Sequence, residues 1–327
     1  MKFSNVSYQG DLTVKSPPRT RTNVLVFTNH GSELVTVNAR GNIFARDTTH
    51  TNTITTVMED FSKNIYTGSS DSTVKKFNKD GAHQWNYSAI TGEVTSLFVS
   101  PVDSNVYVGS SSGEIAKLST VDGTQLWRFS YNGSNAVNEI AISMDGSIYF
   151  SSGSTLTKID AIDGTMTWQM TDHTTTINSI DATINNEIVS VDSNGITKIT
   201  KSDGVVSKSE NVHSSSIVSV STDTTGLIHV MGSDGVVKAL NETLTETASF
   251  TVQGTTFHKL VMDHTGKYFI KVDDKVMAID QLGQGIWVRN ELSGSTLAVT
   301  KLPVLIEPII EVAEFVELLP PTNLSAT

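Results

Sequence analysis

The sequence predicts an all-β protein: a seven-bladed β-propeller of four-stranded antiparallel blades, followed by an extended or helical C-terminal tail. Three observations lead to this prediction. The chain carries a repeat of about forty residues, each repeat holds several short apolar runs, and Asp-Gly or Asn-Gly pairs separate those runs. Four short strands at this period are typical of blades around a central axis. A helical solenoid would need a 3.6-residue apolar period, which these segments lack.

The repeat is defined by the positions at which its units start. Five of the six intervals between starts are 40 or 43 residues long. The starts lie near Thr22, Ile54, Val94, Val137, Ile177, Ile217 and Phe257. Each full unit has the order apolar strand, turn, apolar strand, turn, alternating strand, glycine-containing turn and last strand. Asp-Gly and Asn-Gly pairs suit these hairpins because they readily take the positive φ angles of tight turns.

The first unit is shorter than the others and lacks one strand. It has 32 residues, 22–53, and runs into the second unit after three expected strands. We expect its missing outer strand to come from elsewhere in the chain, which would close the ring and remove an open sheet edge. Either the N-terminal arm, residues 1–21, or residues 295–301 could supply it. The propeller itself is expected over residues 22–301.

Composition excludes several kinds of chemistry. The chain of 327 residues has no Cys, so it has no disulfide, thiol nucleophile or Cys-ligated metal. Its formal net charge of −11 argues against nucleic acid as a partner, because phosphate binding needs clustered Lys and Arg. No phosphate-binding loop, nucleophile elbow, zinc-protease motif or calcium loop occurs. We therefore expect no enzyme activity, no cofactor and no metal.

Three histidines and one pair of aspartates are the candidate ligands that remain. His50, His173 and His213 each lie four residues before a unit start, in loops on one face of the ring. We interpret them as hydrogen-bonding within their own blades, and convergence on a metal is the alternative. Adjacent Asp273 and Asp274 could hold a divalent cation, but we interpret them as a solvated turn.

The segment 302–319 is apolar and acidic, with four glutamates and no basic residue. On a helix beginning near Pro308, its apolar side chains would share one broad face. We expect the segment to be a docking arm that inserts into a neighbouring protein. The predicted partner-binding residues are Leu305, Ile306, Ile309, Val312, Phe315, Val316 and Leu319. Docking on the propeller's own surface and an extended linker are the alternatives. Membrane insertion is not expected, because anionic lipid would repel the glutamates.

Two segments with a turn glycine and a Trp four residues after it, 120–129 and 160–170, resemble the repeat of quinoprotein-type propellers. Trp127 and Trp168 fit that pattern, and Trp85 and Trp287 approximate it. The resemblance implies stacking of the Trp rings between adjacent blades. Quinoprotein dehydrogenases are larger and use a vicinal Cys pair, which this chain cannot supply. Residues 66–77 resemble a WD repeat, with Phe77 where that family has Trp.

The last eight residues, PPTNLSAT at 320–327, resemble the start of a fibronectin type III domain. A propeller joined to such a module is more typical of phage tail proteins and bacterial surface proteins than of metabolic enzymes. We expect a non-enzymatic virion component of a phage tail, baseplate or fibre, made in the host cytoplasm and attached through its terminal arms. The alternatives are a surface adhesion module, for which a bound glycan would be expected, and a propeller enzyme with an axial site.

Overall fold

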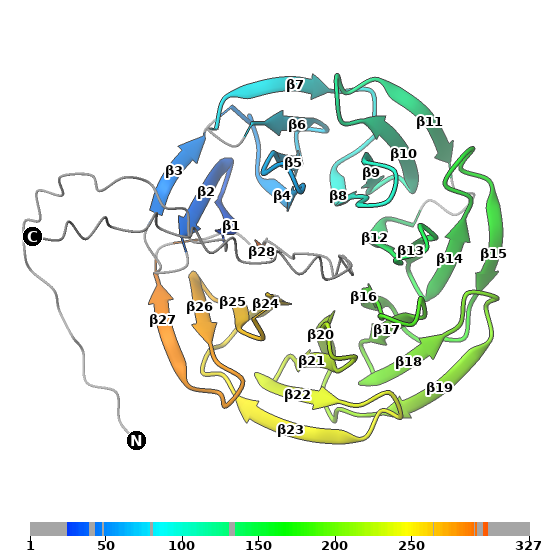
Figure 1. Cartoon of the computed structure of the whole chain (residues 1–327), viewed down its shortest axis with the longest axis vertical. Helices are drawn as coiled ribbons and strands as arrows, with labels where there is room; N and C mark the ends of the chain where they lie inside the picture. Colours follow the sequence, from blue (N-terminus) through cyan, green and yellow to red (C-terminus); the bar gives the residue numbers. More distant parts are fainter. Residues whose placement is uncertain are drawn as a thin grey trace, which may run out of the picture.

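The protein is described from a computed structural model, in which residues 25–38, 43–47, 49–78, 81–130, 135–263, 265–290, 292 and 297–299 are described. Across these residues, seven four-stranded sheets stand as a ring around a central axis (Figure 1). The predicted propeller of four-stranded antiparallel blades is confirmed. The described residues contain no helix, and so none that is long and apolar enough to cross a membrane.

The strands occupy four positions, numbered outward from the axis. The innermost strands are β4 (Ile54–Glu59), β8 (Val94–Val99), β12 (Val137–Ile142), β16 (Ile177–Ala182), β20 (Ile217–Thr222), β24 (Phe257–Met262) and β28 (Leu297–Val299). The second strands are β1 (Leu25–His30), β5 (Ile65–Ser69), β9 (Asn105–Ser110), β13 (Ile148–Ser152), β17 (Ile188–Asp192), β21 (Ile228–Gly232) and β25 (Tyr268–Val272).

The outer half of each blade is made of the two remaining positions. The third strands are β2 (Glu33–Asn38), β6 (Val74–Phe77), β10 (Glu114–Ser119), β14 (Thr155–Ile159), β18 (Ile196–Thr200), β22 (Val236–Leu240) and β26 (Lys275–Ile279). The outermost strands are β3 (Ile43–Asp47), β7 (His83–Tyr87), β11 (Gln125–Ser130), β15 (Met166–Met170), β19 (Val206–Asn211), β23 (Glu246–Thr251) and β27 (Gly285–Arg289).

Six blades are each built from four consecutive strands, and the remaining sheet is composite. In that sheet β28 pairs antiparallel with β1, with Val26 opposite Val299 and Thr28 opposite Leu297. Of the two candidate closing segments, 295–301 is therefore the one whose strand pairs with the first unit. The prediction that the missing strand is the outer one was wrong: β28 is innermost and β3 is outermost. An innermost strand meets both neighbouring blades, so closure there secures the ring on two sides.

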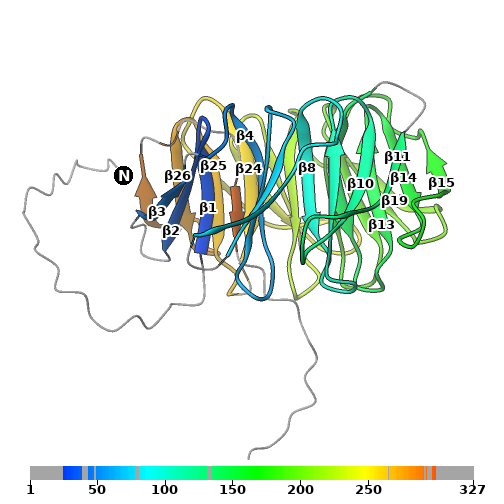
Figure 2. The ribbon, with the colours of Figure 1, turned by 90° about the horizontal axis from the view of Figure 1, so that it is seen from above.

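The disc has two faces, between which the strands run (Figure 2). The turn face is formed by the turns that join the first strand to the second and the third strand to the fourth. The loop face is formed by the turns that join the second strand to the third and by the connections between blades. A hydrogen bond from Thr120 Oγ1 to the Ser104 carbonyl, at 2.7 Å, joins both kinds of turn on the turn face of one blade.

Burial follows the distance from the axis. All five residues are buried in the second strands β5, β13, β17, β21 and β25, because each of these strands is covered on both sides by neighbouring blades. In the outermost strand β23, by contrast, most residues are exposed. The core is therefore a set of mainly apolar layers between blades, and the polar residues of the second strands, such as Thr67, Ser190 and Asp192, are buried within it.

Tryptophans of the outermost strands join neighbouring blades. Trp85 Nε1 donates to the Thr120 carbonyl at 3.1 Å, and its ring covers Gly123, where a Cβ would come within 2.8 Å of the indole. The same contacts recur between Trp127 and the Ala161 and Gly164 turn, and between Trp168 and the Ser202 and Gly204 turn. The predicted stacking of these rings between adjacent blades is confirmed. The glycines are needed for positive φ and for the close approach of the ring.

A lysine strengthens each of these three contacts between neighbouring blades, which we call seams. Lys76 Nζ lies 5.5 Å from the centre of the Tyr66 ring and donates to the Thr120 carbonyl at 2.6 Å. The equivalent pairs are Lys117 with Tyr107 and Lys158 with Tyr149. Burial lowers the pKa of Lys76, with Asp60 opposing the shift. Each lysine therefore joins the second strand of its own blade to the turn of the next.

Three predicted regions lie outside the described residues. They are the N-terminal arm 1–21, the segment 302–319 with its extended or helical alternatives, and the fibronectin-like segment 320–327. All three stay predictions. The predicted partner-binding residues, Leu305 to Leu319, belong to the second of them.

Replacing Trp168 by alanine should lower the free energy of unfolding by about 2–4 kcal/mol, because the indole loses its packing on Gly204 and its hydrogen bond to Ser202. Chemical denaturation measures this change. Met166→Ala, on the same strand at a residue that is 48% exposed, should change stability by no more than about 0.5 kcal/mol. Equal stability of the two variants would contradict a structural role for the ring.

Candidate functional site

The centre of the ring holds a cavity of about 670 Å³. Its wall consists of innermost strands, and residue Leu297 of β28 belongs to it. The cavity extends to the turn face, where residues of the turns after β4, β8, β12, β16, β20 and β24 also line it. A concave space of this size at the axis is the first place to look for a ligand site.

Each innermost strand from β4 to β24 begins with a β-bulge. The pairing register with the second strand shifts between the first and third residues of the strand. A bulge leaves one extra residue out of the ladder and turns nearby backbone groups away from it. The second and third residues of these strands use this freedom to bond to the next blade.

The second residues form a relay around the channel. Each side chain donates to the carbonyl of the first residue of the next innermost strand. The bonds are Thr55 to Val94, Thr95 to Val137 at 2.5 Å, Asn138 to Ile177 at 2.9 Å, and Asn178 to Ile217 at 2.7 Å. At the next position Val218 has no donor, and it packs against the apolar cluster of the following seam instead.

The third residues form a second relay, one residue further along each innermost strand. Each accepts a hydrogen bond from the backbone N–H of the fourth residue of the next innermost strand. The bonds are Ile140 to Ser96 at 2.9 Å, Ile180 to Glu139 at 2.8 Å, Val220 to Ser179 at 3.2 Å, and Leu260 to Ser219 at 3.1 Å. The polar side chains at these positions thus hold the blades together.

One ion pair crosses the channel. Glu139 lies on β12 and Lys259 on β24, and both are third residues of their strands. Two innermost strands separate them in one direction around the ring and three in the other. Glu139 Oε1 pairs with Lys259 Nζ, while Oε2 accepts from Ser179 Oγ at 2.7 Å. The two charges neutralise each other at the axis, where a propeller with an axial site would place its substrate.

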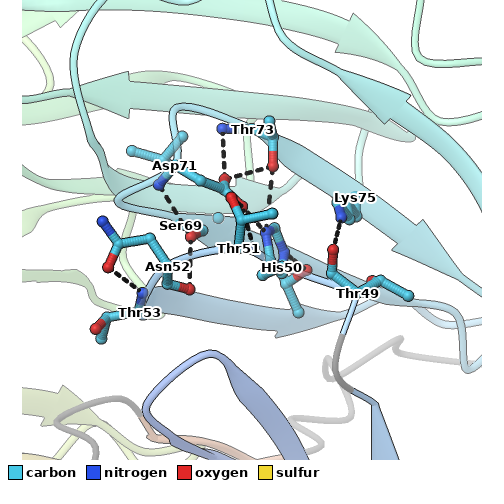
Figure 3. A network of polar contacts seen from close by, with 12 residues as sticks. Thr49, His50, Thr51, Asn52, Thr53, Ser69, Asp71, Thr73 and Lys75 are labelled. Carbon is cyan, nitrogen blue, oxygen red and sulfur yellow. Dashed lines mark hydrogen bonds and ion pairs between the residues drawn. The ribbon is translucent and has the colours of Figure 1, made fainter.

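His50 is held inside its own blade (Figure 3). Its Nδ1 lies 3.0 Å from Asp71 Oδ2 and its Nε2 lies 2.7 Å from Thr67 Oγ1. Asp71 also accepts from the Thr51 N–H at 2.9 Å and from Thr73 Oγ1 at 2.6 Å. Burial alone would raise the pKa of Asp71, but the hydrogen bonds from Thr73, Thr51 and His50 outweigh it and hold this pKa far below its usual range.

His173 repeats this arrangement three blades further on. Its Nδ1 lies 2.9 Å from Asp192 Oδ2 and its Nε2 lies 2.8 Å from Ser190 Oγ, with all three residues buried. Burial lowers the pKa of His173, and the neighbouring carboxylate of Asp192 only partly offsets this. The imidazole is a structural link from the blade connection to the second strand, as the sequence predicted.

His213 has lost one of the two partners. Its Nδ1 lies 3.4 Å from Ser215 Oγ and 3.8 Å from Asp234 Oδ2, but its buried Nε2 has no hydrogen-bond partner. The third residue of the second strand, which is Thr67 or Ser190 in the other two blades, is Val230 here. The polar contact has therefore been replaced by an apolar one.

The side chains for which a metal site was the alternative interpretation do not converge. The three histidines lie in separate blades, and within the described part of the chain no group of three His, Cys, Asp or Glu side chains could hold a metal ion. Asp273 forms a turn with φ of 47°, and its Oδ1 accepts from Thr255 Oγ1 at 2.6 Å and from the Thr256 N–H at 2.8 Å. The predicted turn role of Asp273 and Asp274 is confirmed.

Sequence reasoning missed the two relays and the ion pair. The signal was present, since a polar residue stands at the second or third place of every unit start from Ile54 to Phe257. Periodicity shows only that such residues face the axis. The partner of Glu139, however, lies 120 residues away, and only ring closure brings it close.

Comparison with known proteins gives one family match. Residues 70–226 match the PQQ_2 family model, described as outer membrane protein assembly factor BamB. This stretch is slightly less than half of the chain, and it contains the Trp127 and Trp168 repeats. The match supports the quinoprotein-like character of the repeats. No curated protein matches the chain.

Replacing Val230 by threonine should stabilise the protein by about 1 kcal/mol, because the new hydroxyl can pair with His213 Nε2. Thermal and chemical unfolding measure the gain. Val191→Thr is the matched control: it buries a hydroxyl in another second strand, and it should cost about 1–2 kcal/mol. A loss of stability in both variants would mean that a hydroxyl at residue 230 does not pair with His213 Nε2.

Stability should fall as the pH drops below the ordinary histidine pKa of about 6.5, partly because of His173. The pKa of this buried imidazole is lower in the folded state than in the unfolded state. As the pH falls, His173 therefore binds a proton in the unfolded chain before it does so in the folded protein. The contribution of His173 to stability is present above pH about 6.5 and is lost as the pH falls towards the folded-state pKa. Urea unfolding of the wild type should show a steeper loss than His173→Gln. The exposed His83→Gln should keep the wild-type slope, and equal slopes in all three would rule out this role.

Proposed function

We propose that the protein is a non-enzymatic propeller scaffold that attaches to a larger protein assembly through its C-terminal segment. The observation that carries this proposal is the use of the channel's polar groups. Glu139 and Lys259 neutralise each other across the axis, and the second and third residues of the innermost strands bond to neighbouring blades. Side chains that a catalytic site would need free are thus committed to holding the ring.

The kind of assembly that we propose is a phage virion, in which the propeller would decorate or link parts of a tail, baseplate or fibre. The C-terminal resemblance to a fibronectin type III start supports this choice. The family match supports the wider class, because the matched family is described as a protein assembly factor. A surface adhesion module is the second candidate, supported by the many Ser and Thr residues of the loop face.

The attachment can be tested on the full chain with Val312→Asp and Phe315→Asp combined. This variant should still fold into the same blades, whose residues are unchanged, but its incorporation into the native particle should fall at least about tenfold. Co-sedimentation with particles from the source, followed by quantitative mass spectrometry, measures the incorporation. Glu311→Gln combined with Glu314→Gln is the matched control on the same segment, and it should still be incorporated. Undiminished incorporation of the aspartate variant would overturn the proposal.

A further inference from the structure

The two faces of the disc differ in their exposed apolar side chains. Among the described residues, every large apolar side chain that is strongly exposed on a turn or loop lies on the turn face. They are Phe61, Val102, Val121, Met144, Ile162, Ile184, Val205 and Leu282. Three of them, Val121, Ile162 and Leu282, are more than 80% exposed. The tips of the loop face carry Ser, Thr, Asn, Asp and Gly instead.

The inner members of this set lie beside the central cavity on the turn face. Phe61, Val121, Met144 and Ile184 all line the central cavity. Neighbouring turns also contact one another: the Asp145 N–H donates to Asn186 Oδ1 at 3.0 Å across one seam. The apolar side chains thus form an arc over four consecutive blades. Exposed apolar side chains gathered on one face favour a contact site there.

The chain itself arrives at this face. β28 runs antiparallel to β1, and the β1–β2 turn is on the loop face, where the Ile54 N–H donates to the Gly31 carbonyl at 3.0 Å. Val299 is therefore at the turn-face end of β28. The apolar segment begins six residues later, at Leu305, and six residues span at most about 20 Å. Its first apolar side chains can thus reach the arc without leaving the face.

We propose that residues 305–319 dock on the apolar arc of their own propeller in the free protein. Tethering raises the local concentration of the segment to about the millimolar range, so docking within one chain is favoured over docking on a second copy. The contact is apolar, because the four glutamates of the segment and the turn aspartates, such as Asp122 and Asp163, have the same sign of charge. Added salt screens this repulsion and strengthens the docking.

This inference goes beyond the proposed function, since it describes the free protein. The segment that a partner would bind is stored on the turn face, and a partner has to compete with Phe61, Met144 and Ile184 for the same side chains.

The test uses the absence of cysteine from the chain. Ile184→Cys and Phe315→Cys are combined in the full-length protein, which is treated with a short bismaleimide at low protein concentration. Mass spectrometry should find the two peptides joined within one chain. The matched control combines Phe315→Cys with Ser233→Cys, an exposed residue of the loop face. Sixteen residues separate Val299 from Phe315 and span up to about 55 Å, so the segment can reach either face. The yield should be about tenfold higher for the turn-face pair.

Equal yields at residues 184 and 233 would overturn the proposal, because an undocked tether samples both faces. Cross-links found only between chains would overturn it in favour of a second copy. If the cross-link to residue 184 fails while the Val312→Asp and Phe315→Asp variant still loses particle incorporation, the docking proposal is overturned and the proposed function stands. If the cross-link forms but that variant is incorporated normally, the docking proposal stands and the proposed function is overturned.

A second measurement keeps the test independent of cysteine placement. Met144→Asp combined with Ile184→Asp should speed proteolysis of residues 305–319 about tenfold, because the segment loses part of its apolar cover. Leu126→Asp combined with Val288→Asp, two residues of outermost strands with similar exposure, should leave the rate unchanged. Equal rates in both variants and the wild type would contradict docking on the turn face.

Discussion

The contact between adjacent blades is the interaction on which the rest of the structure depends. A blade has two apolar faces and cannot bury either alone, so each is stable only when a neighbour covers it. The ring closes when β28 pairs with β1 in the composite sheet, which joins residues about 270 positions apart in the chain. In the closed ring, the second strands are covered on both sides. Closure also brings Glu139 and Lys259 together across the axis.

The seams solve the same packing problem with different residues. Trp168 fills the space over Gly204, and Phe250 takes the equivalent place over Gly283. Between these two seams the outermost strand carries Lys208 at the register position of the Trp, and the turn carries Leu244 where the others have glycine. Leu244 is 5% exposed and has φ of 61°. The Leu244 side chain fills from the turn the space that a Trp of the neighbouring outermost strand fills in the other seams. Its burial offsets the strain of a positive φ angle.

The polar groups of the channel also serve the contact between adjacent blades. The bulge at the start of each innermost strand turns backbone groups out of the ladder, and near the axis these groups would be unsatisfied without partners from a neighbouring blade. Asn138 and Asn178 satisfy carbonyls of the next blade, and Ser179 accepts from a neighbouring N–H. Where Val218 and Val230 interrupt these patterns, apolar packing replaces the bond, and His213 keeps a buried nitrogen without a partner. The protein therefore tolerates the loss of single bonds as long as the seam remains packed.

The sequence by itself determined the all-β class, the four strands in each blade, the turn roles of the Asp-Gly pairs and the structural roles of Trp168 and His50. These are local or repeat-level properties, set by a period of about forty residues and by the φ angles that glycine permits. Only the tertiary structure decided that β28 is innermost, that Glu139 meets Lys259, and that the exposed apolar turns share one face. The physical reason is that each depends on residues in different blades, whose distance is set by closure of the ring and not by their spacing in the chain.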